Sequence, residues 1–375
     1  MTAKTKSEDD IRYMRTALAL ARRGLGRVWP NPAVGCVIVR DGNIVGRGWT
    51  QPGGRPHAET EALRRAGDAA RGATAYVTLE PCAHRGKTPP CATALIDAGI
   101  GRCVIAAGDP DPRVDGGGIR LLEEAGIEVL GGICETDAEA VNAGFLSKVR
   151  RQRPFVTLKA ATSIDGRIAT RGGDSQWITG PAARQYGHLL RATNDAILVG
   201  ANTALLDNPT LTCRLPGLGD RSPVRVVVDG HMRLPLTHNL VLEAQETPTW
   251  LFALAPADAE GRERRKAYED SGVTVFDVEQ GEGGRPDPLG LLHRLAGEGI
   301  TRLLIEGGGI IAAAFLTAGL IDELVWFRGA SIIGGDGLPA IAAFGVDRLQ
   351  DAPEASRISV EAMGADLIER YSLRR

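Results

Sequence analysis

Several features are missing from this 375-residue sequence, and each absence excludes a class of protein. The formal net charge is only −2 and no long run of lysine or arginine occurs, so the chain lacks the electrostatic footprint of a nucleic-acid-binding protein. No apolar stretch is long enough to cross a bilayer, and the first residues lack the pattern of a signal peptide. We therefore expect a cytoplasmic protein that binds neither nucleic acid nor membrane.

Cysteine is scarce as well, with six residues in the whole chain. Their number and spacing do not suggest a disulfide framework, which agrees with a reducing compartment. Cys82 and Cys91 lie in a segment that also holds a histidine and a glutamate. The other four lie in or beside apolar stretches, where we expect reduced and inert thiols: Cys36, Cys103, Cys134 and Cys213.

The length and composition are those of a soluble protein with two domains. A chain of 375 residues can form two domains of ordinary size, and its 43% hydrophobic and 24% charged residues are typical of globular proteins. The segment from Arg150 to Pro154 is polar, strongly basic and ends in proline, which makes it the best candidate for a linker. We expect one domain over residues 1–150 and another over 151–375, with no sequence repeat relating them.

The chemistry of the first domain is concentrated between His57 and Cys91. His57-Ala-Glu59 is followed by Cys82, which ends the run Leu-Glu-Pro-Cys, and by Cys91, which ends the run Thr-Pro-Pro-Cys. One imidazole and two thiolates are the ligand set of a catalytic zinc site, which keeps its fourth position open for water. We expect His57, Cys82 and Cys91 to bind one zinc ion per chain. Glu59 is too close to His57 to be needed as a ligand, and we assign it as the general acid and base.

The spacing around these residues places them at the ends of neighbouring elements. Apolar residues recur with helical periodicity, so His57 and Glu59 should open a helix of about four turns. A strand is expected over Ala75–Leu79, just before Cys82, and a second helix should begin at Cys91. Any one of these residues alone is better explained as structural, because free cysteine is often simply buried. The full set predicts a hydrolytic deaminase.

The rest of the first domain alternates between strands and helices, which predicts a layered α/β domain with a largely parallel sheet. Asp41-Gly42 is a typical turn of a β-hairpin. Asn31 precedes the first predicted strand, where it could bind a substrate or cap a turn, and the sequence leaves both open. The expected strands are Cys36–Arg40, Ile44–Gly48, Arg102–Ala107 and Glu128–Leu130, and the expected helices are 11–21, 119–125 and 136–148.

The second domain shows the same alternation and is expected to be another α/β domain. Its predicted strands are 155–161, 196–200, 224–229, 249–254, 273–278, 302–305 and 323–327, and its predicted helices are 181–192, 258–270, 288–297 and 309–318.

A glycine-rich turn is the chemical signal of this domain. The run Leu-Ile-Glu-Gly-Gly-Gly-Ile-Ile from Leu304 predicts a strand, a turn and an apolar helix, and glycines at a helix start allow backbone N–H groups to meet a phosphate. It is not the dinucleotide-binding fingerprint, and taken alone it is better explained as a plain tight turn. Arg191 and Arg214 are candidate phosphate ligands, because guanidinium binds phosphate bidentately, although either one alone could be an ordinary surface residue.

Along nearly all of its length the sequence resembles the bifunctional riboflavin-biosynthesis deaminase/reductase family. In the first domain the resemblance is carried by Asn31-Pro-Ala-Val-Gly, His57-Ala-Glu, the segment from Thr78 to Cys91, and Asp109-Pro-Asp-Pro. In the second domain it is carried by Leu158–Gly166, Ser175–Thr179, Ile197–Gly200, Asp207-Asn-Pro and Ile305-Glu-Gly-Gly-Gly.

The resemblance implies a fold and two consecutive reactions. The fold would be a cytidine-deaminase-like three-layer α/β/α domain followed by a dihydrofolate-reductase-like α/β domain. The first would hydrolytically deaminate 2,5-diamino-6-(5-phosphoribosylamino)pyrimidin-4-one. The second would use NADPH to reduce the ribosyl group to ribityl. The ligand would thus be a small phosphorylated pyrimidine, and a homo-oligomer is possible.

The resemblance also implies which residues form each site. By motif match, Glu59 shuttles protons beside the zinc, and Asn31, His84 and Lys87 contact the deaminase substrate. The matching positions for NADPH are Ala161, Trp177, Thr203, Asp207, Gly230 and the helix start at Gly308, Gly309 and Ile310. Those for the substrate of the reductase are Ser175, Arg191, Leu211, Arg214 and Glu306.

Two departures from the family pattern leave alternatives. Thr50 stands where the family often has a histidine, and Gly230 stands where relatives can carry a hydroxyl residue near the cofactor. One alternative is therefore a zinc deaminase of another pyrimidine with a drifted reductase domain. Another is a nucleic-acid-editing protein built on the deaminase core, which the near-neutral charge and the long segment between Cys82 and Cys91 oppose.

Overall fold

The chain forms two compact units, Met1–Gln152 and Arg153–Arg375. The computed structural model describes residues 7–83 and 89–373, and each unit is built around its own sheet. None of the described helices has both the length and the apolarity needed to cross a bilayer.

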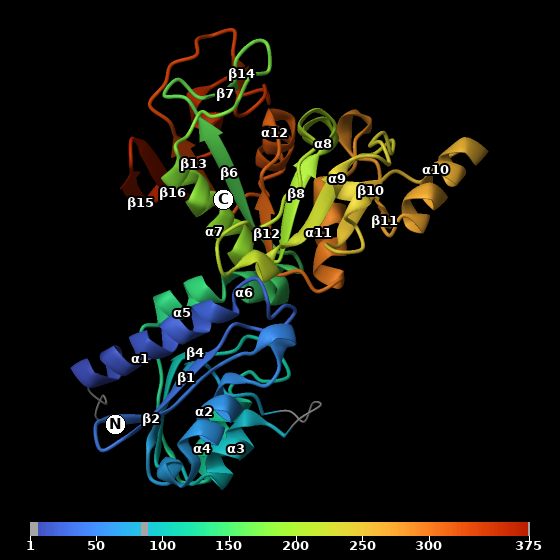
Figure 1. The fold of residues 1–375 in the computed structure, drawn as a ribbon. Helices are drawn as coiled ribbons and strands as arrows, with labels where there is room; N and C mark the ends of the chain where they lie inside the picture. The colour runs from blue at the N-terminus through green and yellow to red at the C-terminus, as the bar shows by residue number, and fades with distance from the viewer. Residues whose placement is uncertain (1–6, 84–88, 374–375) are drawn as a thin grey trace. The chain divides into compact units, whose positions relative to one another are not determined.

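The first unit contains a five-stranded sheet in the order β2-β1-β3-β4-β5 (Figure 1). Its strands are β1 (Gly35–Arg40), β2 (Asn43–Trp49), β3 (Thr74–Leu79), β4 (Arg102–Ala107) and β5 (Glu128–Leu130). β1 pairs antiparallel with both β2 and β3, whereas β3, β4 and β5 are parallel. The prediction of a largely parallel sheet is therefore wrong for half of it. Positive φ angles of 50° at Asp41 and 74° at Gly42 form a tight turn, which returns β2 antiparallel to β1.

Helices cover both faces of this sheet and make three layers. The helices are α1 (Glu8–Ala21), α2 (Ala58–Ala66), α3 (Cys91–Asp97), α4 (Gly117–Glu124), α5 (Glu135–Val141) and α6 (Ala143–Arg151). A Cβ at Gly35 would overlap the backbone of α1 at Ala17, and a Cβ at Gly48 would overlap that of α2 at Ala58. Gly48 is paired with Cys36, the neighbour of Gly35, and successive residues of a strand face opposite ways. α1 and α2 therefore pack closely on opposite faces.

Two helix predictions in this unit are wrong in detail. The helix after His57 ends at Ala66 because Gly67 takes a φ of 53°, and a 3-10 turn continues to Ala70. The single helix predicted over 136–148 is split into α5 and α6 at Asn142, whose side chain accepts a hydrogen bond from the backbone of Ala33 at 2.9 Å.

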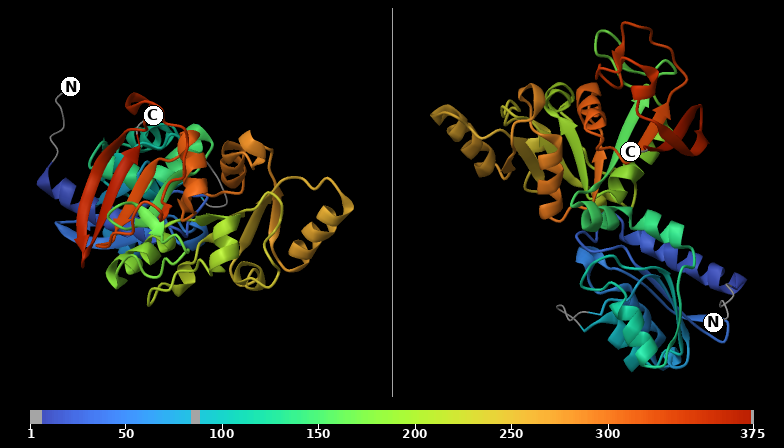
Figure 2. Two further views of the ribbon diagram at one scale, coloured as in Figure 1. Left: turned by 90° about the horizontal axis from the view of Figure 1, so that it is seen from above. Right: turned by 180° about the vertical axis from the view of Figure 1, so that it is seen from behind.

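The second unit contains a nine-stranded sheet in the order β11-β10-β9-β8-β12-β6-β13-β16-β15. The strands are β6 (Phe155–Thr162), β8 (Ala196–Gly200), β9 (Val224–Val228), β10 (Thr249–Ala253), β11 (Thr274–Asp277), β12 (Arg302–Ile305), β13 (Glu323–Arg328), β15 (Ala355–Met363) and β16 (Asp366–Leu373). A separate pair is formed by β7 (Arg167–Ala169) and β14 (Leu338–Pro339). The strands from β11 to β13 are all parallel, and β16 and β15 run antiparallel at the edge, drawn in red in Figure 2.

The helices of this unit are α7 (Pro181–Thr193), α8 (Ala201–Asp207), α9 (Asn239–Leu242), α10 (Ala259–Asp270), α11 (Pro288–Gly297) and α12 (Gly309–Thr317). All seven predicted strands and all four predicted helices are present, whereas α8, α9 and the hairpin of β15 and β16 were not predicted. β9, β8, β12 and β6 lie side by side and parallel, so their carboxyl ends meet along one edge. Ligands of open α/β sheets bind at such an edge.

Candidate active sites

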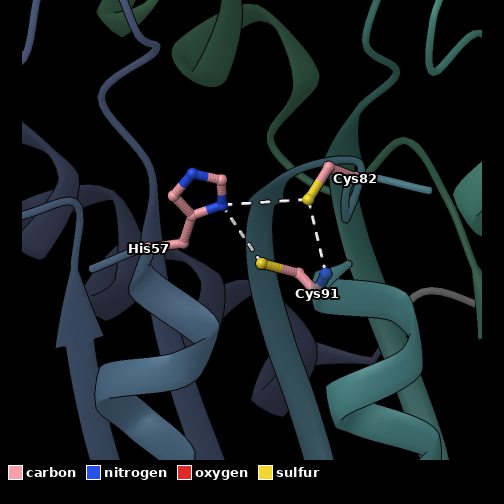
Figure 3. A group of neighbouring side chains, drawn as sticks. All are labelled: His57, Cys82 and Cys91. Atoms are coloured by element: carbon pink, nitrogen blue, oxygen red, sulfur yellow. Dashed lines mark hydrogen bonds between the residues drawn. The ribbon is translucent and has the colours of Figure 1, made fainter. Parts of the chain in front are cut away.

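In the first unit His57, Cys82 and Cys91 converge from three neighbouring elements, as Figure 3 shows. His57 is the residue before α2, Cys82 follows β3, and Cys91 is the first residue of α3. The Nδ1 atom of His57 lies 3.2 Å from the sulfur of Cys91 and 3.8 Å from that of Cys82. The ligand atoms of the three residues all lie within 4.8 Å of one another.

This geometry fits a zinc ion. Ligands bound to one tetrahedral zinc at about 2.0–2.3 Å are themselves about 3.3–3.8 Å apart, which is close to both distances from the imidazole nitrogen. The backbone N–H of Cys91 also donates to the sulfur of Cys82 at 3.3 Å, so the start of α3 favours a thiolate there. Hydrogen bonding from Cys91, which burial opposes, lowers the pKa of Cys82 to about 4.

Glu59 is suited to carry a proton beside this site. It lies in the first turn of α2 with only 3% of its surface exposed. Burial raises the pKa of its carboxyl group, although the neighbouring His57 acts in the opposite direction. Its carboxylate also interacts with the thiol of Cys91, so it faces the ligand set instead of solvent.

A pocket opens over the ligands. Its lining residues are Asn31, Pro32, Val34, Thr50, His57, Glu59, Leu79, Glu80, Cys82 and Asp109. Asn31 therefore lines the same pocket as His57, Glu59 and Cys82. The other two predicted substrate contacts, His84 and Lys87, lie outside the described residues.

Two acidic residues of this pocket were not assigned from the sequence. The carboxylate of Glu80, which is 5% exposed, accepts hydrogen bonds from backbone N–H groups of the segment from Asp109 to Ile119, at 3.0 Å from Gly118 and 3.2 Å from Gly116. It thereby caps α4 and fixes the loop beside Cys82. Burial raises the pKa of Asp109 to about 6. Both residues lie within motifs that carry the family resemblance, but a sequence motif does not show which acidic side chain faces the pocket.

Thr50 has a structural role at the rim of this pocket. Its hydroxyl accepts a hydrogen bond from the N–H of Val34 at 3.0 Å and donates one to the carbonyl of Pro32 at 3.1 Å. The side chain is 3% exposed and fixes the segment that follows Asn31. Thr50, which replaces the histidine common in the family, therefore supplies a hydroxyl that forms hydrogen bonds within the protein.

In the second unit, Glu306 and Arg191 form a largely buried ion pair at the end of β12, with 10% and 15% of their side chains exposed. The guanidinium of Arg191 donates two hydrogen bonds to the carboxylate of Glu306, both at 2.9 Å, and a third to the carbonyl of Thr212. The ammonium of Lys159, which the sequence analysis did not single out, lies 3.8 Å from the same carboxylate. Burial opposes ionisation of Glu306, but Arg191 and Lys159 outweigh it and hold its pKa at about 2.

Two of the other predicted substrate contacts, Leu211 and Arg214, lie on the segment 210–214. Because Arg191 uses its nitrogens within the protein, the exposed Arg214 is the better candidate for a phosphate. The backbone N–H of Arg214 donates to Nδ1 of His188 at 3.4 Å, which brings a third basic side chain to this site. Leu211 is 4% exposed and has a φ of 54°, so only its backbone is available to a ligand.

The start of α12 forms a cradle that fits the pyrophosphate of a dinucleotide. Gly308 precedes the helix and Gly309 opens it. A Cβ at Gly308 would lie 3.5 Å from the hydroxyl of Thr203, so the starts of α8 and α12 meet here. A Cβ at Gly309 would lie only 2.8 Å from the carbonyl oxygen of Pro339. The close approach of Pro339 explains why glycine occupies this position, and the first N–H groups of a helix have no acceptor within the helix and can meet a phosphate. Ile310 is 44% exposed at the surface.

The remaining predicted positions extend this site along the sheet edge. Ala161 is near the end of β6, and Gly230 follows β9. Trp177 is 66% exposed, and the guanidinium of Arg184 lies 4.5 Å from its ring centre. Asp207 ends α8, and Ser175 is exposed two residues before Trp177. No described contact joins these residues directly to the ion pair of Arg191 and Glu306.

Comparisons with known proteins match both units. Residues 154–368 match the family model described as the RibD C-terminal domain, and residues 7–107 match the cytidine and deoxycytidylate deaminase zinc-binding region. The riboflavin biosynthesis protein RibD of Bacillus amyloliquefaciens is 44% identical over 356 residues, which cover 95% of this chain and 94% of that protein. The RibD protein of Escherichia coli is 41% identical over 369 residues, or 96% of this chain and 98% of that one.

Solved structures show the same likeness over both units. A structure of Acinetobacter baumannii RibD has a TM-score of 0.87 at 38% identity and covers 98% of this chain and 99% of its own. A diaminohydroxyphosphoribosylaminopyrimidine deaminase/5-amino-6-(5-phosphoribosylamino)uracil reductase from Thermotoga maritima has a TM-score of 0.84 at 34% identity, with the same coverage.

Proposed function

The chain belongs to the RibD family of bifunctional riboflavin-biosynthesis deaminase/reductases, and from that membership we propose which residues carry its two reactions. It uses zinc to deaminate 2,5-diamino-6-(5-phosphoribosylamino)pyrimidin-4-one and NADPH to reduce the ribosyl group of the product. We assign the deaminase to residues 1–150 and the reductase to residues 151–375.

The arrangement of His57, Cys82, Cys91 and Glu59 is the observation that carries the deaminase assignment. Zinc held by these ligands would lower the pKa of a bound water to about 7. Glu59 takes a proton from the attacking water and delivers it to a ring nitrogen. It then takes the second proton from the hydroxyl that is now on carbon and gives it to the amino group, which leaves as ammonia. Asn31 holds the pyrimidine in the pocket, with His84 and Lys87 as further contacts.

Zinc content and ammonia release on the diaminopyrimidine phosphate test this assignment. The wild-type enzyme should hold one zinc per chain and release ammonia. The Glu59→Gln variant should hold the same zinc and lose ammonia release by about 100-fold to 10000-fold, because it removes only the proton carrier. Normal turnover by this variant would show that Glu59 is not the proton carrier. If the wild type bound zinc but released no ammonia, the metal site would stand and the substrate assignment would be wrong.

The buried cluster of Glu306, Arg191 and Lys159 carries the reductase assignment. NADPH supplies the hydride, and the protein aligns the reacting carbon with it. Arg214 binds the substrate phosphate, Ser175 and the backbone of Leu211 complete that contact, and the cluster around Glu306 holds the ribose. Ala161, Trp177, Thr203, Asp207, Gly230 and the helix start at Gly308, Gly309 and Ile310 are the proposed NADPH contacts.

The Glu59→Gln protein provides a direct test of the reductase. Given the deaminated product and NADPH, it should oxidise NADPH as fast as the wild-type enzyme, and given the diaminopyrimidine it should not. The alternative of a drifted reductase domain predicts no oxidation in either case. That alternative is not favoured, because the reductase-domain model matches residues 154–368 and the Arg191–Glu306 pair is intact.

We further propose that the chain is a cytoplasmic enzyme that forms a homodimer through β15. This strand ends the nine-stranded sheet, and Ile358 and Val360 on it are 55% and 45% exposed. An unpaired strand edge can pair with the same strand of a second copy, which would cover both the edge and these two side chains.

Light scattering of the purified chain tests the dimer. The wild type should have twice the mass of one chain, and Val360→Lys should shift it toward the monomer. A monomeric wild type would contradict the proposal, as would a Val360→Lys variant that keeps the wild-type mass.

A further inference from the structure

The adenosine end of the cofactor can be placed from the order of the strands. The pyrophosphate cradle joins the ends of β8 and β12 at Thr203 and Gly308, and the substrate cluster around Glu306 lies on the side toward β6. The nicotinamide must point toward that cluster, so the adenosine runs the other way. The next strand in that direction is β9, about 4.8 Å beyond β8.

The acidic residue at the end of β9 is not available to a ribose. Enzymes specific for NAD often use an acid near this place to bind the ribose 2′-hydroxyl. Here Asp229 is 1% exposed, and its Oδ2 accepts hydrogen bonds from the N–H groups of Arg233 at 2.5 Å and Leu234 at 3.0 Å. This buried carboxylate is already hydrogen-bonded within its own turn. It is therefore not available to accept a hydrogen bond from the ribose 2′-hydroxyl of NADH.

Gly230, the next residue, cannot discriminate between the cofactors either. It has no side chain, and a Cβ there would lie 3.2 Å and 3.3 Å from the ring of Pro286. The same contact shows that the segment ending in Pro286 lies against the turn after β9. It brings the exposed Arg285, which precedes Pro286, to the same edge.

Two further arginines reach this turn. Arg233 is half exposed, with its Nε 3.4 Å from Oδ1 of Asp229. Arg264 of α10 donates a hydrogen bond to the carbonyl of His231 at 3.3 Å. Its ion-pair partner Glu260 is 79% exposed, and such surface pairs are weak. Three basic side chains from three separate segments therefore surround a turn that has no exposed acid of its own.

We propose that Arg233, Arg264 and Arg285 bind the 2′-phosphate of NADPH and are the source of selectivity over NADH. The inference rests on the proposed reductase function and adds what the resemblance leaves open. A phosphate dianion between guanidinium groups forms charge-assisted hydrogen bonds that the 2′-hydroxyl of NADH cannot replace.

Calorimetric binding of NADP⁺ and of NAD⁺ to the zinc-loaded full chain tests the proposal without relying on turnover. Arg264→Ala and Arg285→Ala should each weaken NADP⁺ about tenfold or more, since one hydrogen bond to a charged group contributes about 1.5–3 kcal/mol. NAD⁺ affinity should not change in either variant. Arg262→Ala, which removes an exposed arginine from the same helix, should change neither affinity and serves as the control.

Arg233 needs a second variant, because its removal also disturbs Asp229. Arg233→Lys keeps the positive charge and should retain part of the preference for NADP⁺ that Arg233→Ala loses. An equal fall in both affinities would overturn the proposal, since it would mean that the arginines only support the fold. Unchanged affinities in all three alanine variants would overturn it as well. A wild type that binds neither nucleotide would instead contradict the proposed reductase site itself.

Discussion

The deaminase and reductase sites differ in how their residues are distributed along the chain. The zinc ligands and Glu59 all lie between residues 57 and 91, at the ends of consecutive elements. The proposed reductase residues extend from Lys159 to Ile310 and come from the ends of parallel strands, from helices and from the loops at 175–177 and 211–214. The first site is therefore assembled locally, whereas the second exists only when the sheet has the correct strand order.

The difference also concerns what holds each site together. In the first unit a metal can draw three side chains to one point, and the donors are already spaced for it. In the second unit the central group is a buried ion pair, which needs both partners because a single buried charge is strongly destabilising. Loss of one group should thus harm chemistry in the first site and folding in the second.

The largest expected effect is loss of the metal. Cys82→Ser should abolish zinc binding and deamination, lower the melting temperature of the first unit, and leave NADPH-dependent reduction unchanged. Metal analysis, ammonia release and NADPH oxidation on the same preparation would measure all three. The matched control is Cys134→Ser, which should keep zinc, and parallel loss of reduction in Cys82→Ser would contradict the separation of the two sites.

The next effect concerns the buried pair of the second unit. Glu306→Ala leaves the guanidinium of Arg191 buried without its carboxylate and should destabilise the second unit by about 3–5 kcal/mol. Denaturant unfolding followed by hydrogen exchange in each unit would localise the change. Glu298→Ala, which breaks the half-exposed pair with Arg294, should cost at most about 1 kcal/mol. If both substitutions lowered the free energy of unfolding equally, burial would not be what makes the Arg191–Glu306 pair important for folding.

Acid should affect both units by the same mechanism. Burial opposes ionisation of Asp10, but hydrogen bonds from Arg102, Ser7 and Tyr76 outweigh it and lower its pKa to about 2. Glu306 is held at about 2 in the second unit. A lowered pKa stabilises the folded state above the unfolded values of 3.8 and 4.5, and this stability is lost as the pH falls toward 2.

Unfolding measured between pH 5 and about 2 should therefore show a steady loss of stability in both units. Asp10→Asn should flatten this dependence in the first unit only, as hydrogen exchange near Tyr76 would report. If Asp10→Asn left the acid dependence of the first unit unchanged, the stabilising role of the Asp10–Arg102 contact would be wrong.

The smallest expected effect is at Thr50. Thr50→Val removes the hydroxyl that joins Val34 and Pro32 and should cost about 1–3 kcal/mol while shifting Asn31, so the KM of deamination should rise. Thr50→Ser keeps the hydroxyl and should behave like the wild type. A changed kcat with an unchanged KM would place Thr50 in the chemistry instead of at the rim of the pocket.

The sequence by itself determined the class of each unit and indicated the cluster of His57, Cys82 and Cys91 that the structure brings together beside Glu59. Ligands close in the chain, each at the start or end of an element with a clear periodicity, can be placed without knowing the rest of the fold. The strands β8, β9, β10 and β12 of the second unit were predictable for a related reason. They are buried on both faces, and such strands have a short continuous run of apolar residues. The exposed edge hairpin of β15 and β16 carries no such run.

Only the tertiary structure decided which polar groups face one another. The pairing of Arg191 with Glu306 joins residues that are 115 positions apart, and the capping of α4 by Glu80 joins residues that are 38 apart. The antiparallel half of the first sheet and the break at Asn142 likewise depend on contacts with distant segments. Local periodicity reports burial and element type, whereas the partner of a buried charge is fixed by strand order and helix packing, which no local pattern contains.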